Sequence, residues 1–211
     1  MGIMKIIKRG AEAILYLEGE SLVKERVKKS YRLPQIDTEL RIGRTRREAK
    51  LLSDARRSGV NTPTIVSVDE KNSKIVMEYI KGERLKEFLN GTNDENRKKT
   101  AEDVGKAVGT LHKQGIVHGD LTTSNMILKN GKIYLIDFGL GEFTKRTESL
   151  AVDLSVMKEA FKSTHFKHLN LLWDSFIKGY KQTNNNFNKV LEALDNIEKR
   201  GRYVKRDGRK N

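Results

Sequence analysis

The sequence predicts an α+β fold in two lobes, the first rich in strands and the second mostly helical. Short β-like runs surround one amphipathic helix up to residue 80, and apolar residues at helical spacing dominate from there to residue 197. Lys81-Gly82 interrupts the pattern between the two regions. We therefore expect a β-rich lobe at residues 1–80, a mostly helical lobe at 81–198 and a flexible basic tail at 199–211.

The N-terminal pattern indicates an antiparallel sheet with one inserted helix. Turn residues such as Gly10 and Gly19 separate the strand-forming runs. Apolar residues at helical spacing around Glu48 predict a helix at residues 40–58, and Gly59 stands at its expected end. The expected strands are residues 5–7, 13–17, 21–27, 64–68 and 73–79.

The C-terminal pattern indicates helices around one short hairpin. An apolar stripe from Ala101 to Leu111, followed by Gly115, predicts a helix of about twenty residues. Asn130-Gly131 lies between two apolar runs and predicts a tight hairpin turn. Further helices are expected at residues 150–161, 169–180 and 187–197.

Composition indicates a basic globular protein. The 211 residues carry 42 Lys+Arg against 28 Asp+Glu, a formal net charge of +14, and 36% of them are hydrophobic. That charge favours a polyanionic partner. The absence of cysteine excludes thiol catalysis, thiolate-bound zinc and disulfides. No run approaches the roughly 18 apolar residues of a membrane span, so we expect a cytoplasmic protein without a membrane partner.

Two motifs carry the chemistry: His118-Gly-Asp-Leu-Thr-Thr-Ser-Asn125 and Ile136-Asp-Phe-Gly139. Transfer of a γ-phosphoryl group needs a carboxylate that orients or deprotonates the acceptor hydroxyl, and oxygen ligands for magnesium. Asp120 suits the first role, whereas Asn125 and Asp137 suit the second. The hairpin between the motifs is expected to bring Asn125 and Asp137 together.

Phosphoryl transfer also needs a fixed cation on the nucleotide phosphates. Glu48 lies on the apolar face of its predicted helix, where an unpaired carboxylate would be costly, so it requires a basic partner inside the fold. Lys24 on the third strand is the candidate. A strand lysine followed by a helix glutamate is the order used by kinases, so we assign Lys24 to the α and β phosphates of ATP and Glu48 to orienting Lys24.

The remaining contacts to ATP are expected where the two lobes meet. The backbone around Met77, Glu78 and Ile80 should contact the adenine, because this segment ends the fifth strand at the boundary. Asp153, on the helix that follows the second motif, is expected to fix the Asp120 loop by accepting backbone hydrogen bonds.

These residues match a protein kinase with a truncated C-terminal lobe. The loop Arg9-Gly-Ala-Glu-Ala13 has one glycine where kinases have Gly-x-Gly-x-x-Gly. Gly119 replaces the arginine of His-Arg-Asp, so no arginine is placed to clamp a phosphorylated loop. Ala-Pro-Glu is missing after Gly139, and the next helix follows closely. We therefore expect no activation segment of the usual kind.

The chain resembles the small atypical serine/threonine kinase subunit of the KEOPS (EKC) tRNA-modification complex over nearly its whole length. The catalytic-loop octapeptide 118–125 is the most specific part of the resemblance. The other matching segments are Gly10-Ala-Glu-Ala13, Val23-Lys24, Tyr31-Arg32, Pro34, Thr45 to Ala49, Asp137 to Leu140, Val152 to Leu154, Ser163 to His165 and Arg200-Gly-Arg202.

The resemblance implies an ATP- and Mg²⁺-dependent enzyme that autophosphorylates on Ser or Thr or hydrolyses ATP. It implies a place in the complex that makes threonylcarbamoyl adenosine in tRNA, where the kinase docks on the threonylcarbamoyl-transferase subunit beside the other KEOPS subunits. The first loop is assigned to the nucleotide through Gly10, Ala11, Glu12 and Ala13. Tail residues are assigned to tRNA as a polyanion: Arg202, Lys205, Arg206, Arg209 and Lys210.

Two other classes stay open. Small-molecule and Rio-type phosphotransferases share His-Gly-Asp, but they differ in the Thr-Thr-Ser that follows and in the glycine-poor first loop. A small-molecule phosphotransferase would also need an acidic or polar substrate cleft that the short helical region scarcely provides. A non-catalytic RNA-binding adaptor would retain the fold, but it gains nothing from keeping Lys24, Asp120, Asn125 and Asp137.

Overall fold

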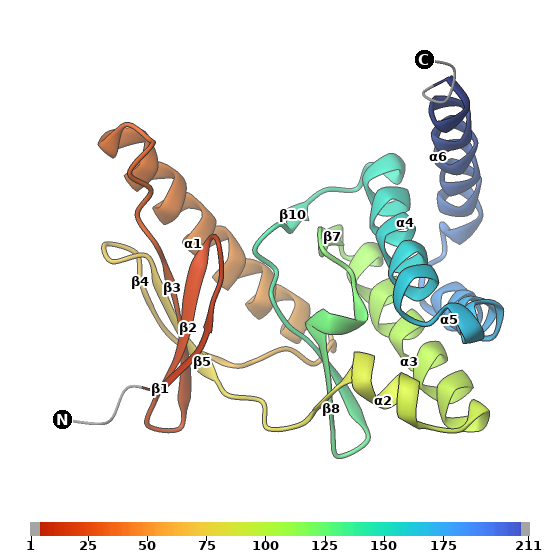
Figure 1. Cartoon of the computed structure of the whole chain (residues 1–211), viewed down its shortest axis with the longest axis horizontal. Coiled ribbons are helices and arrows are strands. Elements are labelled where there is room, and N and C mark those ends of the chain that lie inside the picture. The colour runs from red at the N-terminus through yellow and green to blue at the C-terminus, as the bar shows by residue number, and fades with distance from the viewer. Residues whose placement is uncertain (1–4, 208–211) are drawn as a thin grey trace.

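A computed structural model describes residues 5–207 of the chain, with side chains as far as residue 200. Its N-terminal part is a five-stranded antiparallel sheet with one long helix beside it (Figure 1). In spatial order the strands are β1 (Lys5–Arg9), β2 (Ala13–Glu18), β3 (Ser21–Arg26), β5 (Lys74–Glu78) and β4 (Ile65–Asp69). All five predicted strands are thus present, each within two residues of its expected bounds.

The register of the sheet positions its central strand, β3. Lys24 pairs with Leu15 on β2 and with Ile75 on β5. Because side chains alternate between the faces of a strand, Lys24 and Arg26 point to the same face. Both side chains are buried.

Helix α1 (Pro34–Arg57) begins six residues earlier than the apolar pattern predicts. Its first turns expose Ile36 and Leu40, so they show no buried stripe, but Pro34 occupies the first turn, where its fixed φ favours a helix. The end is as predicted, because Gly59 follows with a φ of 93°. The buried face of α1 carries Glu48 among small and aliphatic residues.

The C-terminal part consists of helices around a small hairpin (Figure 1). The four longer helices were predicted, whereas α2 and the two-residue strands are too short to give a periodic signal. The elements are β6 (Glu83–Arg84), α2 (Leu85–Gly91), α3 (Asp94–Lys113), β7 (Ile116–Val117), η1 (Thr123–Asn125), β8 (Met126–Lys129), β9 (Lys132–Leu135), β10 (Glu142–Phe143), α4 (Thr147–Thr164), η2 (Phe166–His168), α5 (Leu169–Thr183) and α6 (Phe187–Asp207).

The hairpin β8–β9 confirms the prediction from Asn130-Gly131. Both turn residues have positive φ, 51° and 71°, as a type I′ turn requires. The turn sets the register in which Met126 faces Leu135. It thereby brings Asn125, at the end of the first motif, beside Ile136, at the start of the second.

One hydrophobic cluster joins the two parts of the molecule. It runs from Leu52 on α1 and Met77 on β5 to Phe138 and the helices of the C-terminal part. Phe138 is 1% exposed, and its ring packs against His118 with centroids 4.5 Å apart. The second motif is therefore anchored in the core by its phenylalanine.

Helix α6 corrects the expectation at the C-terminus. It continues through residues 199–207, although a helix end at residue 197 and a flexible tail from 199 were expected. Lys and Arg are good helix formers, and a single glycine costs a helix only about 1 kcal/mol. Arg202, Lys205 and Arg206 thus lie within the helical span, whereas Arg209 and Lys210 lie outside the described residues.

Within residues 5–207, no helix is both long and apolar enough to cross a bilayer.

Helices α3 and α5 pack at close range because glycines of each helix lie against the backbone of the other. A Cβ added at Gly109 would lie 2.8 Å from the carbonyl oxygen of Tyr180. A Cβ at Gly105 would lie 2.8 Å from the backbone nitrogen of Tyr180. A Cβ at Gly179 would likewise clash with the backbone of α3 at Glu102. A methyl group at any of these positions would push the two backbones apart.

We expect Gly105→Ala to lower the free energy of unfolding by about 1–3 kcal/mol, because the methyl group overpacks this contact. Gly43→Ala is the matched control: no atom lies within 4 Å of its added Cβ on α1, so it should stabilise by about 0.5–1 kcal/mol. Denaturant unfolding of both variants measures the difference. Equal stabilities would contradict the close approach of α3 and α5.

Candidate active site

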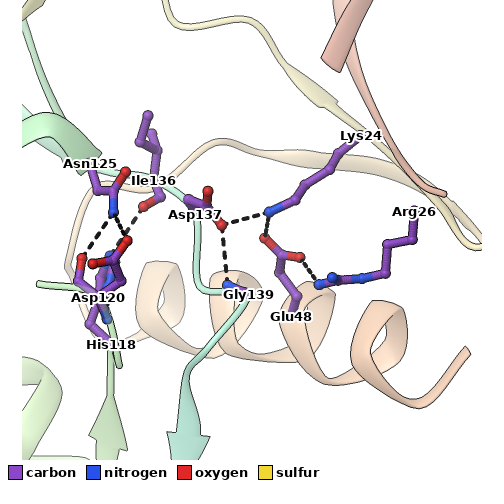
Figure 2. Close-up of polar contacts among 9 residues, drawn as sticks. All are labelled: Lys24, Arg26, Glu48, His118, Asp120, Asn125, Ile136, Asp137 and Gly139. Carbon is purple, nitrogen blue, oxygen red and sulfur yellow. Dashed lines mark hydrogen bonds and ion pairs between the residues drawn. The ribbon is translucent and has the colours of Figure 1, made fainter. Parts of the chain in front are cut away.

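Four charged side chains from distant parts of the chain meet between the sheet, α1 and the second motif (Figure 2). Lys24 Nζ lies 2.6 Å from Glu48 Oε1 and 2.6 Å from Asp137 Oδ1. Arg26 Nη2 lies 2.6 Å from the other oxygen of Glu48. We call Lys24, Arg26, Glu48 and Asp137 the four-charge cluster. Glu48 therefore has the buried lysine partner that its position predicted, together with a second partner, Arg26.

The surroundings favour the charged forms of Lys24 and Asp137. Burial lowers the pKa of Lys24, but the charges of Glu48 and Asp137 outweigh burial, so the pKa lies above its ordinary value. Desolvation similarly raises the pKa of Asp137, and the charge and hydrogen bond of Lys24 outweigh it, so that pKa is lowered. Lys24 and Asp137 thus stabilise each other's charge.

The backbone at Asp137 is unusual for a residue other than glycine. Its φ is 64°, in the left-handed region. The N–H of Gly139 donates to Asp137 Oδ1 at 3.3 Å. A Cβ added at Gly139 would lie 3.4 Å from Lys24 Nζ and would crowd the Asp137 carboxylate at 3.1 Å. This local geometry directs the Asp137 carboxylate toward Lys24.

Asp120 and Asn125 form a second polar group beside the cluster (Figure 2). The Asn125 amide nitrogen donates to Asp120 Oδ2 at 2.8 Å and to the Asp120 carbonyl oxygen at 2.9 Å. Its amide oxygen points away from Asp120. The N–H of Ile136 donates to the Asn125 carbonyl at 2.9 Å, so the hairpin does bring Asn125 beside Asp137, as predicted.

Asp153 on α4 holds the backbone of the first motif, as predicted. It is 1% exposed and accepts from the N–H groups of His118 at 2.8 Å and Gly119 at 2.9 Å. His112 Nε2 lies 3.2 Å from the same carboxylate. Burial raises the pKa of Asp153, but these hydrogen bonds and the neighbouring imidazoles outweigh it and lower that pKa.

His118 joins the two motifs through both ring nitrogens. Nε2 lies 3.1 Å from the Ile136 carbonyl oxygen, which only accepts, and Nδ1 lies 3.3 Å from the N–H of Asp120, which only donates. These partners suit the tautomer that carries its proton on Nε2. His118 therefore ties the Asp120 loop to the segment that enters Asp137.

Gly119 stands in place of arginine for a geometric reason. Its φ is 81°, and a Cβ there would overlap the carbonyl of Leu140. The chain after Gly139 folds back onto the loop, with Glu142 on β10 paired to Val117 on β7. The short segment thus occupies the space that a side chain at position 119 would need.

Two adjoining cavities share Lys24 and Asp137. The first has an apolar lining that includes Leu15, Leu22 and Ile127, and the residues expected around the adenine line it: Met77, Glu78 and Ile80. Glu48 and Asn125 also reach this cavity. The second, with a volume of about 270 Å³, is lined by residues 10–13, Arg26, Arg44 and Asp120.

The first loop is tied down rather than free. Glu12 Oε2 lies 2.7 Å from Arg44 Nη1 on α1, and Lys29 Nζ donates to the Ala11 carbonyl. Gly10 N–H donates to the Ala13 carbonyl at 2.9 Å, which closes a tight turn. Glu12 therefore faces a cation of α1 at the edge of the second cavity.

Arg26 and Arg44 were not identified from the sequence. The signal for Arg26 was its spacing of two residues from Lys24, which places both on one face of a strand. Arg44 gave no such signal, because its contact with Glu12 depends on how α1 lies against the first loop.

Comparison with known proteins defines the class. The sequence matches the protein kinase domain family over residues 14–168, so the chain is a member of that family. It is 49% identical to the "KEOPS complex subunit Bud32" of Pyrococcus abyssi, with 96% of this chain and 98% of the relative covered. The chain therefore belongs to the Bud32 family of KEOPS subunits.

Other relatives are longer. The "probable bifunctional tRNA threonylcarbamoyladenosine biosynthesis protein" is 42% identical in Methanococcus maripaludis and 45% identical in Methanosarcina mazei. The chain spans 36% of the length of each. Among solved structures, "WaaP in complex with acyl carrier protein" matches with a TM-score of 0.67 at 16% identity, over 97% of this chain and 89% of that one. That likeness concerns the fold.

We expect Asp153→Asn to lower the free energy of unfolding by about 1–3 kcal/mol, because the new amide N–H₂ would face backbone donors that need an acceptor. Asp174→Asn, at an exposed position on α5, is the matched control and should change stability by less than about 0.5 kcal/mol. Chemical denaturation compares the two variants. An Asp153→Asn protein as stable as the control would contradict the role of Asp153 in holding the loop.

Proposed function

We propose that this protein is an ATP- and Mg²⁺-dependent phosphoryl-transfer enzyme, acting as a serine/threonine kinase, an ATPase or both. The observation that carries the proposal is the convergence of Lys24, Glu48 and Asp137 within 2.6 Å contacts beside the Asp120–Asn125 pair. A cation held between two carboxylates, next to a third carboxylate and an amide, supplies the groups that phosphoryl transfer needs.

ATP lies across the two cavities in this proposal. The adenine enters the apolar cavity and meets the backbone at Glu78 and Ile80. The N–H of Glu78 already donates to the Thr64 carbonyl at 2.8 Å, so the base pairs with the Glu78 carbonyl and the Ile80 backbone. The phosphates extend toward Lys24 and the second cavity, beneath Gly10, Ala11, Glu12 and Ala13.

Each polar side chain has a separate task. Lys24 binds the α and β phosphates, and Glu48 keeps its ammonium group in place. Asp120 orients the attacking hydroxyl or water and accepts its proton, while the Asn125 amide fixes the Asp120 carboxylate. The Asn125 amide oxygen and the Asp137 carboxylate are hard oxygen ligands of the kind that magnesium takes. Magnesium, when bound, neutralises charge on the phosphates.

We further propose that the enzyme acts in the formation of threonylcarbamoyl adenosine in tRNA, as a KEOPS subunit that docks on the threonylcarbamoyl-transferase subunit. The names of its relatives support this setting: one is a KEOPS complex subunit, and others are bifunctional threonylcarbamoyladenosine biosynthesis proteins. The net charge of +14 agrees with tRNA as a partner. No observation favours a small-molecule acceptor or a non-catalytic adaptor.

Asp137→Asn should abolish magnesium-dependent ATP turnover, because it removes the carboxylate proposed to hold the metal. Asp120→Asn should lower kcat by about 10²- to 10⁴-fold while ATP binding stays close to that of the unmodified protein. Turnover assays together with calorimetric ATP binding separate the two effects. Asp174→Asn serves as the control, and full turnover by the Asp137→Asn protein would refute the site assignment.

Neutralising the basic residues near the C-terminus should weaken tRNA binding in a salt-dependent way. Each phosphate contact adds about 0.7 to the slope of log K against log salt on single strands and about 0.9 on duplex. If three of the five charges make contact, the variant's slope should be less steep by roughly two to three units. The variant replaces five residues by glutamine: Arg202, Lys205, Arg206, Arg209 and Lys210.

The control removes the same net charge elsewhere, so that general electrostatic attraction is matched. Titrations of tRNA with both variants across a salt series, with the transferase partner present, measure the slopes. The same slope change in both variants would mean that tRNA senses net charge and not this segment. The control replaces five exposed lysines by glutamine: Lys71, Lys81, Lys98, Lys99 and Lys132.

A further inference from the structure

Arg26 is the member of the four-charge cluster that the proposed reaction does not use. Its Nη2 lies 2.6 Å from Glu48 Oε2, and the two side chains are 5% and 1% exposed. Lys24 takes the other Glu48 oxygen. Both oxygens of this buried carboxylate are therefore bound by cations of the same strand.

The strand fixes Arg26 as firmly as it fixes Lys24. The N–H of Arg26 donates to the Ser73 carbonyl at 3.1 Å, and Arg26 pairs with Ala13 on β2. A guanidinium is planar and presents its N–H donors in a fixed fork, and here the buried side chain is directed at Glu48. Arg26 thus contacts α1 from a rigid position on the sheet.

In a regulated kinase, phosphorylation of the activation segment controls whether the glutamate of this helix pairs with the strand lysine. This chain has neither part of that device: Gly119 replaces the arginine, and only residues 140–146 separate Gly139 from α4. Even so, the Lys24–Glu48 contact is formed. Something within the chain must hold it.

We propose that Arg26 is a positioning residue, which locks Glu48 and α1 against Lys24 without any phosphorylation. This inference rests on the proposed function only for its effect on turnover. Lys24 is shared between Glu48 and Asp137, so it cannot hold Glu48 alone as firmly as the pair of cations does. Without Arg26, three members of the cluster would remain with two negative charges and one positive.

The kinetic test compares Arg26→Gln with Arg26→Lys. Arg26→Gln should lower kcat about tenfold, the loss that one charge-assisted hydrogen bond accounts for. Arg26→Lys should keep most of the turnover, because a single contact to Glu48 is needed and a lysine supplies it. The matched control is Arg46→Gln, an exposed arginine of α1 that pairs with Glu70. A kcat for Arg26→Gln equal to that of the control would overturn the proposal.

A double-mutant cycle tests whether Arg26 acts through Glu48. In a Glu48→Gln background the lock has no carboxylate to hold, so adding Arg26→Gln should leave kcat unchanged. A further tenfold loss in that background would overturn the proposal. If Arg26→Gln alone fails to fold, Arg26→Lys still places a cation beside Glu48, and a tenfold loss of kcat in Arg26→Lys would then overturn the proposal.

A distance measurement tests the lock without any turnover. The chain has no cysteine, so Glu39→Cys on α1 and Lys98→Cys on α3, both exposed, accept spin labels at two defined sites. Pulsed electron paramagnetic resonance should give one narrow distribution, unchanged by phosphatase treatment and broadened by Arg26→Gln. Broadening by phosphatase alone, or none in Arg26→Gln, would overturn the proposal, whereas an inactive wild type would count only against the proposed function.

Discussion

The buried carboxylate of Glu48 is the constraint on which the arrangement of the site depends. It lies on α1 among apolar residues and is 1% exposed, so leaving it unpaired would cost several kcal/mol. The fold meets this requirement with Lys24 and Arg26 from a single strand. Because Lys24 also contacts Asp137, the same pairing joins the sheet, α1 and the second motif. The ion pair that compensates the burial of Glu48 therefore also positions Lys24, the candidate phosphate-binding cation.

The departures from an ordinary protein kinase are physically linked. The left-handed backbone at Gly119 lets the chain after Gly139 fold directly against the loop, so no side chain fits at position 119. The same folding leaves no room for a long regulatory segment before α4. The first loop, poor in glycine, is held to α1 by Glu12 and Arg44. In a member of the Bud32 family, these features together describe a site whose parts are held by the chain itself.

Much of this arrangement was predictable because it follows local rules. Asn130-Gly131 specified the hairpin, and the hairpin places Asn125 beside Asp137. The apolar spacing around Glu48 predicted both its burial and its need for a basic partner. The five strands followed from β-forming runs between turn residues. Each of these predictions depends on residues that are neighbours in sequence or on one periodic face.

The sequence by itself determined the longer elements, the order of the motifs and the pairing of Lys24 with Glu48. Only the tertiary structure decided that Arg26 takes the second oxygen of Glu48, that Glu12 meets Arg44 and that glycines let α3 and α5 approach closely. The tertiary structure also shows that α1 begins at Pro34 and that α6 extends to Asp207. These features depend on which surfaces meet in space, and an ion pair between residues 12 and 44 has no periodic signature along the chain.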